Sequence, residues 1–317
     1  MKKILSAVII LLLASLVSAQ TLPSKQLTII TSFPVGSGPD SVLRKIQPDL
    51  SKTLGATVII ENKPGGNGAV AFEACNRAVN DSQNVSLCYT EAAVVWAIPL
   101  IYGKDDLVKN LKFIGISHYA PLVLVTSTGI STRQEFIDHV KSHPNFGSWS
   151  VGSVGQISGQ ELINQLHLSA QHVAYKDYGQ WLMDVSNQNL GFSFPTLGSA
   201  TPLYRAGKIK FIAVASKHRD PVFSDVPTIS EYLGNSNFVP LGAYAGFYVK
   251  KDMPETYEKS LSAGLKQVLN TTDVKSDLII RGYRPWTHTD AETKQILYEE
   301  QAHYYQSLKQ FDINLRP

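Results

Sequence analysis

The feature of this sequence that most limits its fold is a repeated alternation of short β-rich runs with amphipathic segments. The β-rich runs are largely apolar and lie at residues 27–31, 57–60, 85–89, 112–117, 122–126, 172–174, 190–194, 210–215 and 246–250. Between them, apolar residues such as Val42, Ile46 and Leu50 recur at the spacing of a helix face. Strands that are apolar on both faces are covered by helices on both sides. The pattern therefore predicts an α/β fold with mostly parallel sheets.

Several residues predict where individual helices begin or bend. Ser131 followed by Gln134, and Thr289 followed by Glu292, have the spacing of capping boxes that open helices. Pro48 lies inside a helical pattern and is expected to kink that helix.

The first residues predict export. Lys2 and Lys3 precede a nearly continuous apolar run over residues 4–17, and small residues ending at Ala19 follow. This order is typical of a signal peptide, so we expect residues 1–19 to be cleaved and the protein to reach the periplasm. A membrane anchor is the alternative, but the apolar run is short for a span and polar residues follow it.

Charge and metal-binding residues exclude several classes of function. The net charge of +3 falls to about +1 once Lys2 and Lys3 are removed, because 27 basic residues then oppose 26 acidic ones. Such a chain is not expected to bind nucleic acid or an anionic membrane. The histidines have no metal-ligand spacing, and Cys-x-x-Cys does not occur. We expect neither a metal nor a cofactor.

The sequence contains two cysteines, Cys75 and Cys88. An even number of cysteines in an oxidising compartment favours a disulfide. Two buried free thiols are the alternative, and the sequence does not decide between them.

The chain is long enough for two domains, and two short interruptions suggest where they meet. Strand-like runs adjoin at residues 118–121, and a Gly-containing interruption precedes a strong strand at 241–244. We therefore expect one discontinuous lobe from residues 20–119 and 245–317, and a second from 120–244. Two chain crossings of this kind form a hinge, with a cleft between the lobes.

A first glycine-rich turn, "FPVGSGPD", lies between a predicted strand and a predicted helix. Ligands of α/β sheets bind at the carboxyl ends of strands, where helix N-termini offer N–H groups to anions. Gly36 and Gly38 would let the backbone approach such an anion closely. The alternative is that Asp40 or Ser37 caps the helix and uses these donors itself.

Two further glycine-rich turns follow. "ENKPGGNGAVAFEA" matches the G-x-G-x-x-A dinucleotide pattern, but it belongs to the second strand–helix unit, and an exported protein has little access to NAD. We interpret residues 65–68 as a loop against the cleft or as a plain turn. "SWSVGSVGQISGQEL" places small and hydroxyl residues before another helix and lacks the G-x-S-x-G of a hydrolase nucleophile.

Motifs along nearly the whole chain resemble one family. They are "FPVGSGPD", "IENKPGGNGAVAFEA", "VAYKDYG", "LYRAGKIKFIAVAS", "DVPTISEYL" and "GFYVKKDMP", in that order. This order resembles the Bug or TctC family, the extracytoplasmic solute receptors of tripartite tricarboxylate transporters. The resemblance implies a type 2 periplasmic-binding-protein fold, a carboxylate held by backbone N–H groups and water, and handover to permease subunits.

The resemblance also implies a set of ligand-binding residues. They are Phe33, Pro34, Gly36, Ser37 and Gly38 in the first loop, Gly65 and Gly66 in the second, and Ser153, Gly155 and Gln156 in the loop at 150–158. Tyr175, Trp149 or Tyr119 would line the far end of the site, although aromatic residues at such positions also pack in cores.

Two departures from the family pattern concern charge. Where the family has an Asp in the cleft, this chain has Pro195 followed by Thr196, and where the family has small residues after the third strand it has Glu91. A Glu91 side chain in the cleft would repel a dicarboxylate and favour a ligand carrying an amine. The alternative is a surface or inter-loop salt bridge.

The leading hypothesis is a monomeric binding protein that captures a small organic acid by lobe closure, without catalysis. A receptor that signals to a membrane sensor would have the same lobes and remains an alternative. An exported enzyme is disfavoured, because neither Ser37 nor Ser153 has a readable His–acid pair beside it.

Overall fold

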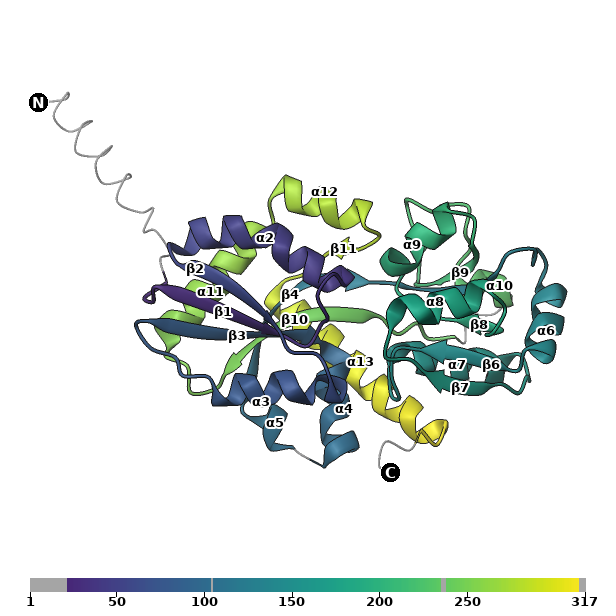
Figure 1. Ribbon diagram of the computed structural model, residues 1–317, viewed down its shortest axis with the longest axis horizontal. Coiled ribbons are helices and arrows are strands. Elements are labelled where there is room, and N and C mark those ends of the chain that lie inside the picture. The colour runs from purple at the N-terminus through teal and green to yellow at the C-terminus, as the bar shows by residue number, and fades with distance from the viewer. Residues whose placement is uncertain (1–21, 104, 235–237, 314–317) are drawn as a thin grey trace, which may run out of the picture.

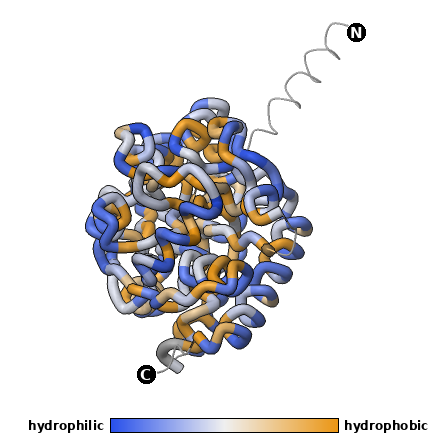
Figure 2. Tube along the Cα trace, turned by 90° about the vertical axis from the view of Figure 1, so that its right-hand side faces the viewer, coloured by the Kyte–Doolittle hydropathy of each residue, from blue (hydrophilic) through white to orange (hydrophobic). Residues whose placement is uncertain are grey.

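The computed structural model describes residues 22–103, 105–234 and 238–313. The predicted signal peptide, residues 1–19, lies outside the described residues. Two β-sheets lie side by side along the long axis of the molecule, each with its own helices (Figure 1). Seen along that axis, hydrophilic segments follow the outside and hydrophobic stretches run through the interior (Figure 2).

The first sheet has six described strands. In spatial order they are β11 (Arg284–Pro285), β4 (Leu111–Ala120), β10 (Ala243–Lys250), β3 (Asn84–Glu91), β1 (Gln26–Thr31) and β2 (Thr57–Asn62). Strand β1 pairs in parallel with β2 and β3, whereas β10 pairs antiparallel with β3 and β4. The carboxyl ends of β1, β2 and β3 therefore meet at one edge.

The second sheet has five described strands. Their order is β7 (Gln171–Ala174), β6 (Asn145–Ser148), β8 (Phe192–Ser193), β5 (Leu122–Ser127) and β9 (Ile209–Ala215). Strand β6 pairs in parallel with β7 and β8, and β5 pairs antiparallel with β8 and β9.

Both sheets are thus mixed, and the prediction of mostly parallel sheets is wrong in this respect. A strand buried on both faces is apolar whichever way it runs, so periodicity carries no information on strand direction. Each predicted run lies in or overlaps an observed strand, whereas β6 and β11 were not predicted. Strand β6 reads NFGS and β11 has two residues, so neither offers a β-rich run to detect.

The helices cover the outer faces of both sheets. They are α2 (Gly38–Leu54), α3 (Ala69–Arg77), α4 (Ala92–Tyr102), α5 (Asp106–Lys109), α6 (Arg133–Ser142), α7 (Val154–Gln165), α8 (Tyr178–Ser186), α9 (Leu197–Arg205), α10 (Ile229–Leu233), α11 (Glu255–Leu269), α12 (Thr272–Ile280) and α13 (Asp290–Gln310). Around the first sheet, α2, α11 and α12 pack together, and α3, α4 and α5 form a second group (Figure 1). No helix in the described ranges is both long enough and apolar enough to cross a bilayer.

We call the first sheet with its helices the first half of the molecule, and the second sheet with its helices the second half. Helix α13 follows strand β11 of the first half along the chain, but it also contacts the second half. It contacts α4 of the first half and α7 of the second (Figure 1). It opens with the predicted capping box, in which Thr289 accepts a hydrogen bond from the backbone N–H of Glu292.

One other helix prediction needs correction. Helix α6 is capped by Thr132 and Glu135, one residue later than the predicted Ser131 and Gln134. The Glu135 carboxylate accepts hydrogen bonds from the N–H groups of both Ser131 and Thr132, and this register satisfies two free donors at once. Helix α2 runs from Gly38 to Leu54 with Pro48 inside it, and the kink at Pro48 stays a prediction.

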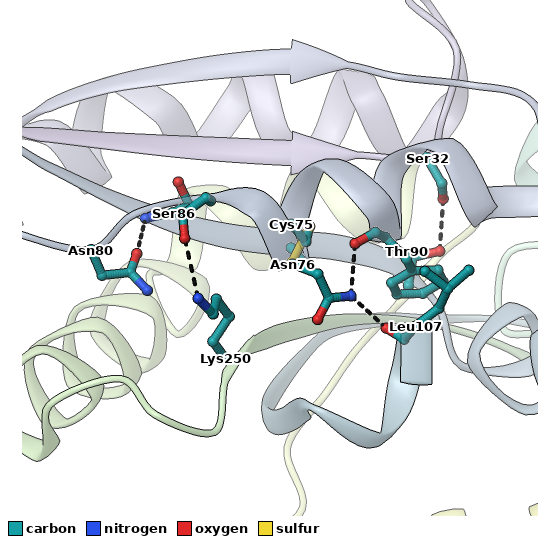
Figure 3. Close-up of a disulfide and its surroundings, with 11 residues drawn as sticks. Ser32, Cys75, Asn76, Asn80, Ser86, Thr90, Leu107 and Lys250 are labelled. Carbon is teal, nitrogen blue, oxygen red and sulfur yellow. Dashed lines mark hydrogen bonds between the residues drawn. A yellow bond between two sulfur atoms is a disulfide. The ribbon is translucent and has the colours of Figure 1, made fainter. Parts of the chain in front are cut away.

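Cys75 of α3 and Cys88 of β3 form a disulfide, with their Cα atoms 6.0 Å apart (Figure 3). Both residues are buried in a small apolar cluster between α3 and the sheet. The bridge ties α3 to the strand whose end opens helix α4.

Candidate ligand-binding site

A partly open cavity lies where the two halves meet, with about 180 Å³ of empty space if the solvent at its mouth is included. Residues of the first half that line it are Asn67, Glu91, Ala93, Val94 and Ala97, and those of the second half are Trp149, Ser150, Gly152 and Ser153.

The first wall of the cavity is the N-terminal turn of helix α4. Strand β3 ends at Glu91, which is also the N-cap residue of α4, and its side chain makes no capping hydrogen bond. The first N–H groups of a helix have no partner within the helix, and they carry about half a positive charge together. Ala93, Val94 and Ala97 line the cavity beside them.

The turn at residues 65–68 completes this wall. Gly65, Gly66, Asn67 and Gly68 all have positive φ, at 113°, 55°, 49° and 93°. A β-carbon on Gly68 would lie 2.4 Å from Cγ1 of Val94, so only glycine permits this contact with α4. The glycines thus hold Asn67 at the cavity, whereas Gly65 and Gly66 are themselves exposed.

The second wall is the turn between β6 and α7. Ser153 is the N-cap of α7, and its hydroxyl oxygen accepts a hydrogen bond from the N–H of Gln156. The side chain of Gln156 in turn accepts a 2.7 Å hydrogen bond from the N–H of Gly152. A β-carbon on Gly155 would lie 2.8 Å from the Trp149 ring, so Gly155 allows the indole to pack at the cavity. Gly155 and Gln156 therefore support the wall without lining it.

A buried hydrogen-bond network fixes the Ser153 side chain. Its hydroxyl donates to the hydroxyl oxygen of Ser148 at 2.8 Å. Ser148 donates to the carbonyl of Ser150, so the contact of its oxygen with His172 Nε2, at 2.7 Å, requires His172 to be the donor. Burial lowers the pKa of His172 to about 4, which keeps the imidazole neutral.

Glu91 is the acidic residue of the cavity wall. The residue is 7 % exposed, and its Oε1 has no hydrogen-bond partner within the described part of the chain. Burial raises the pKa of this carboxyl to about 8. No ion pair involves Glu91 among the described residues, so the interpretation as a surface or inter-loop salt bridge is wrong.

The first glycine-rich turn lies outside the cavity lining. Its Gly36 N–H donates a 2.8 Å hydrogen bond to Asp40 Oδ2, which is the alternative that the sequence left open. Burial alone would raise the pKa of Asp40, but hydrogen bonds from Arg44, Asn62 and Gly36 lower it, so the carboxylate stays charged. Ser37 donates to the carbonyl of Pro34.

The remaining members of that loop are also occupied. A β-carbon on Gly38 would overlap the hydroxyl of Tyr283, so this side chain covers the start of α2. Phe33 packs against Tyr89 with ring centroids 5.5 Å apart, and Pro34 is exposed. Tyr283 comes from the far end of the chain, and no local pattern signals its position over Gly38.

The other predicted residues also lie away from the cavity lining. Tyr175 donates a hydrogen bond to Asp184 Oδ2 at 2.8 Å. Pro195 is buried after β8, and Thr196 is the N-cap of α9 with its N–H bonded to the Tyr178 hydroxyl. Tyr119 packs against Tyr244, with ring centroids 5.0 Å apart. Of the predicted side chains, Glu91, Ser153 and Trp149 line the cavity.

Sequence reasoning missed Ala93, Val94 and Ala97 on helix α4. One signal was present, because a helix that begins directly after a buried strand in an α/β sheet points its N-terminus at the ligand edge. Because the sequence of α4 is almost wholly apolar, it predicts a buried core helix rather than the wall of a binding site.

Known proteins similar to this chain share its family and its fold. Residues 42–313 match the family described as "Tripartite tricarboxylate transporter family receptor". A UPF0065 protein of Bordetella pertussis is 24% identical over 302 residues, which cover 93% of this chain and 92% of that protein. The protein BugT of the same organism is 23% identical over 296 residues, covering 91% of this chain and 90% of its own.

Two solved structures have the same fold as this chain. The structure of R. palustris Rpa4515 with adipate has a TM-score of 0.82 and 20% identity, covering 92% of this chain and 98% of its own. The periplasmic binding protein BugD has a TM-score of 0.78 and 20% identity, covering 92% and 99%. These likenesses show that the chain has the periplasmic-binding-protein fold.

Proposed function

Because this chain belongs to the tripartite tricarboxylate transporter receptor family, we propose that its cavity captures a small organic acid for delivery to a membrane permease. The observation that carries the proposal is the meeting of two helix N-termini, those of α4 and α7, at one cavity between the two halves. Each terminus comes from a different half, so a ligand held by both would join them.

The chemistry of the two helix ends favours a carboxylate. Free N–H groups and the positive end of the helix dipole together form an anion site. Hydrogen bonds from N–H groups to a carboxylate are charge-assisted and stronger than neutral ones. The related Rpa4515 was solved with adipate, a dicarboxylate, which supports the same ligand class here.

Lobe closure is the proposed means of capture. The chain passes from the first sheet to the second after β4, which ends at Ala120, and returns at β10, which begins at Ala243. We assign residues 20–119 and 245–317 to one lobe and 120–244 to the other, with these crossings as the hinge. Tyr304 of α13 donates a hydrogen bond to the carbonyl of Gly152, and Arg284 pairs with Asp220, so two further contacts join the lobes.

Binding without catalysis is part of the proposal. The Ser148 hydroxyl donates its proton to the Ser150 carbonyl, and His172 donates to Ser148 rather than accepting from it. His172 in this orientation is not the general base that a nucleophilic serine needs.

The setting follows from the family. We propose export by the signal peptide at residues 1–19, a periplasmic monomer without metal or cofactor, and handover to the permease subunits of a tripartite tricarboxylate transporter. Neither nucleic acid nor membrane is a proposed partner.

Titration calorimetry of the chain that begins at residue 20 tests this function. The ligand class is found by titrating mono-, di- and tricarboxylates, aromatic acids and amino acids. Neutral sugars and amides of matched size serve as controls. We expect saturable 1:1 binding of at least one small acid and none of the controls. Binding of the neutral compounds alone would contradict the proposal.

A further inference from the structure

We propose that Glu91 forms a subsite for a cationic nitrogen, so that the acid held in this cavity carries an amine or another protonated nitrogen. The inference rests on the proposed function and narrows its ligand class. The acid group would bind at the helix ends, and the cationic group would pair with the Glu91 carboxylate.

The first support is the isolation of the Glu91 carboxyl. It is more than nine-tenths buried, lines the cavity, and leaves Oε1 without a hydrogen bond inside the described protein. Buried polar atoms in native proteins are nearly always paired, and an unpaired buried carboxylate is strongly disfavoured. An ammonium group in the cavity would provide both the hydrogen bond and the opposite charge.

The second support is the composition of the wall around Glu91. The other lining residues are Asn67, alanines, Val94, Trp149, serines and Gly152, and none of them carries an ionisable group in the range from pH 5 to 8. No lysine or arginine of the described wall is therefore available as the partner. Trp149 also lines the cavity, and indole rings attract cations that approach their face.

The third support is the placement of Glu91 at the beginning of α4. The same helix end that offers N–H groups to a carboxylate carries the Glu91 side chain as its N-cap residue. A ligand in which an amine lies a few bonds from a carboxylate, as in an amino acid, would meet both groups within one small cavity. A plain dicarboxylate would instead bring like charges together whenever Glu91 is ionised.

Ionisation of Glu91 makes the subsite depend on pH. The titratable groups on which the Glu91 charge acts are Tyr178, Tyr248 and Tyr304, and burial raises the pKa of each. These hydroxyls stay neutral from pH 5 to 8, so Glu91 alone changes charge there. Since its carboxyl is largely protonated at pH 7 before binding, pairing with a cation should release close to one proton.

The experiment compares acids in matched pairs, each an amine-bearing acid and its counterpart without the amine, such as glutamate with glutarate and aspartate with succinate. Calorimetry at pH 7 gives the affinity of the wild-type chain, Glu91→Gln and Glu300→Gln. Glu300 is the control, because it is a second largely buried carboxyl with an unpaired oxygen but does not line the cavity. Calorimetry in two buffers of different ionisation enthalpy gives the number of protons that the protein releases when the ligand binds.

We expect wild type and Glu300→Gln to bind the amine-bearing member of at least one pair tenfold or more tightly than its counterpart, with proton release. Glu91→Gln should weaken that binding by tenfold or more and change the counterpart little. The proton measurement needs no variant, so it decides the question even if Glu91→Gln fails to fold.

Two outcomes would overturn the inference, and they differ in what they mean. If the acids without an amine bind equally or more tightly, with no proton release, Glu91 is not a cation subsite, although the carboxylate function stands. The same result is expected if a protonated Glu91 donates a hydrogen bond to a ligand carboxylate, so that case also counts against the cation subsite. If the wild type binds no acid of either kind, the proposed function fails as well.

Discussion

The Tyr304 hydroxyl donates a 2.6 Å hydrogen bond to the carbonyl oxygen of Gly152, and this bond joins helix α13 of one half to the cavity turn of the other. Both residues are buried. The contact places a lobe-to-lobe bond directly on the ligand site, so the conformation of the halves and the shape of the cavity are linked.

Tyr304→Phe is therefore expected to weaken ligand binding. The variant leaves a buried carbonyl without its partner, which costs about 1–3 kcal/mol of the free energy of the closed form. Dissociation of the acid, followed by stopped-flow fluorescence, should become severalfold faster. Tyr305→Phe is the matched control, because the Tyr305 hydroxyl bonds to the carbonyl of Trp96 in the same half. Equal dissociation rates for wild type and Tyr304→Phe would show that this bond does not hold the lobes.

Ser153→Ala tests the second wall of the cavity. Loss of an N-cap typically costs about 1 kcal/mol of stability. Thr271→Ala removes the same kind of cap from α12, far from the cavity, because the Thr271 side chain accepts from the N–H of Val274. We expect similar small losses in melting temperature for both variants, but weaker acid binding for Ser153→Ala alone. Parallel losses of affinity in both would remove Ser153 from the site.

Gly68→Ala tests the turn that holds Asn67. Gly68 has a φ of +93°, and the added β-carbon would lie 2.4 Å from Val94 on α4. The strain of positive φ alone costs about 1–3 kcal/mol, and displacement of α4 should abolish acid binding as well. Gly234→Ala is the control, since its φ is +72° with no atom within 4 Å. Calorimetry of both variants should find binding intact only in Gly234→Ala, and full affinity in Gly68→Ala would contradict this account.

Glu91→Gln is expected to stabilise the ligand-free protein more as the pH rises. Burial raises the pKa of Glu91 from 4.5 to about 8 in the folded state, so the folded protein holds this proton more tightly than the unfolded chain does. Wild-type stability therefore falls between these two pH values, and a glutamine side chain removes that slope. The difference should be on the order of 4 kcal/mol at pH 8 and below about 1 kcal/mol at pH 5.

Urea unfolding of both proteins at pH 5, 6, 7 and 8 measures this difference. Glu300→Gln is measured in the same way as a second buried carboxyl, because burial also raises the pKa of Glu300, to about 7. A stability difference between wild type and Glu91→Gln that does not change with pH would mean that Glu91 is not buried as a neutral acid.

The sequence predicted the strands and the helix start after the third glycine-rich turn, because both depend on local patterns. Ser153 follows strand β6 and caps α7, and a small or hydroxyl residue at such a position is a local signal of a helix start. The role of the first turn was not predictable in the same way. Asp40 lies close in sequence, so its bond to the Gly36 N–H is a local alternative, but the covering of Gly38 by Tyr283 depends on a contact between distant parts of the chain.

Glu91 shows the limit of charge arguments made from sequence. A glutamate at the end of a strand is usually solvated or paired, and the sequence left that alternative open. Its burial results from the packing of α4 and of the other half of the molecule around the cavity, which the strand pattern does not contain. The local signal for a role of Glu91 in the site was a carboxyl group at the strand end, where the family has small residues.

A crystal structure of the chain from residue 20, grown with an acid that it binds, tests the central claim most directly. We predict that the acid group lies within hydrogen-bond distance of the first-turn N–H groups of α4 and near Ser153 of α7, with both lobes in contact. An acid bound instead at the turn containing Gly36 and Gly38, or on the outer surface of either half, would contradict it.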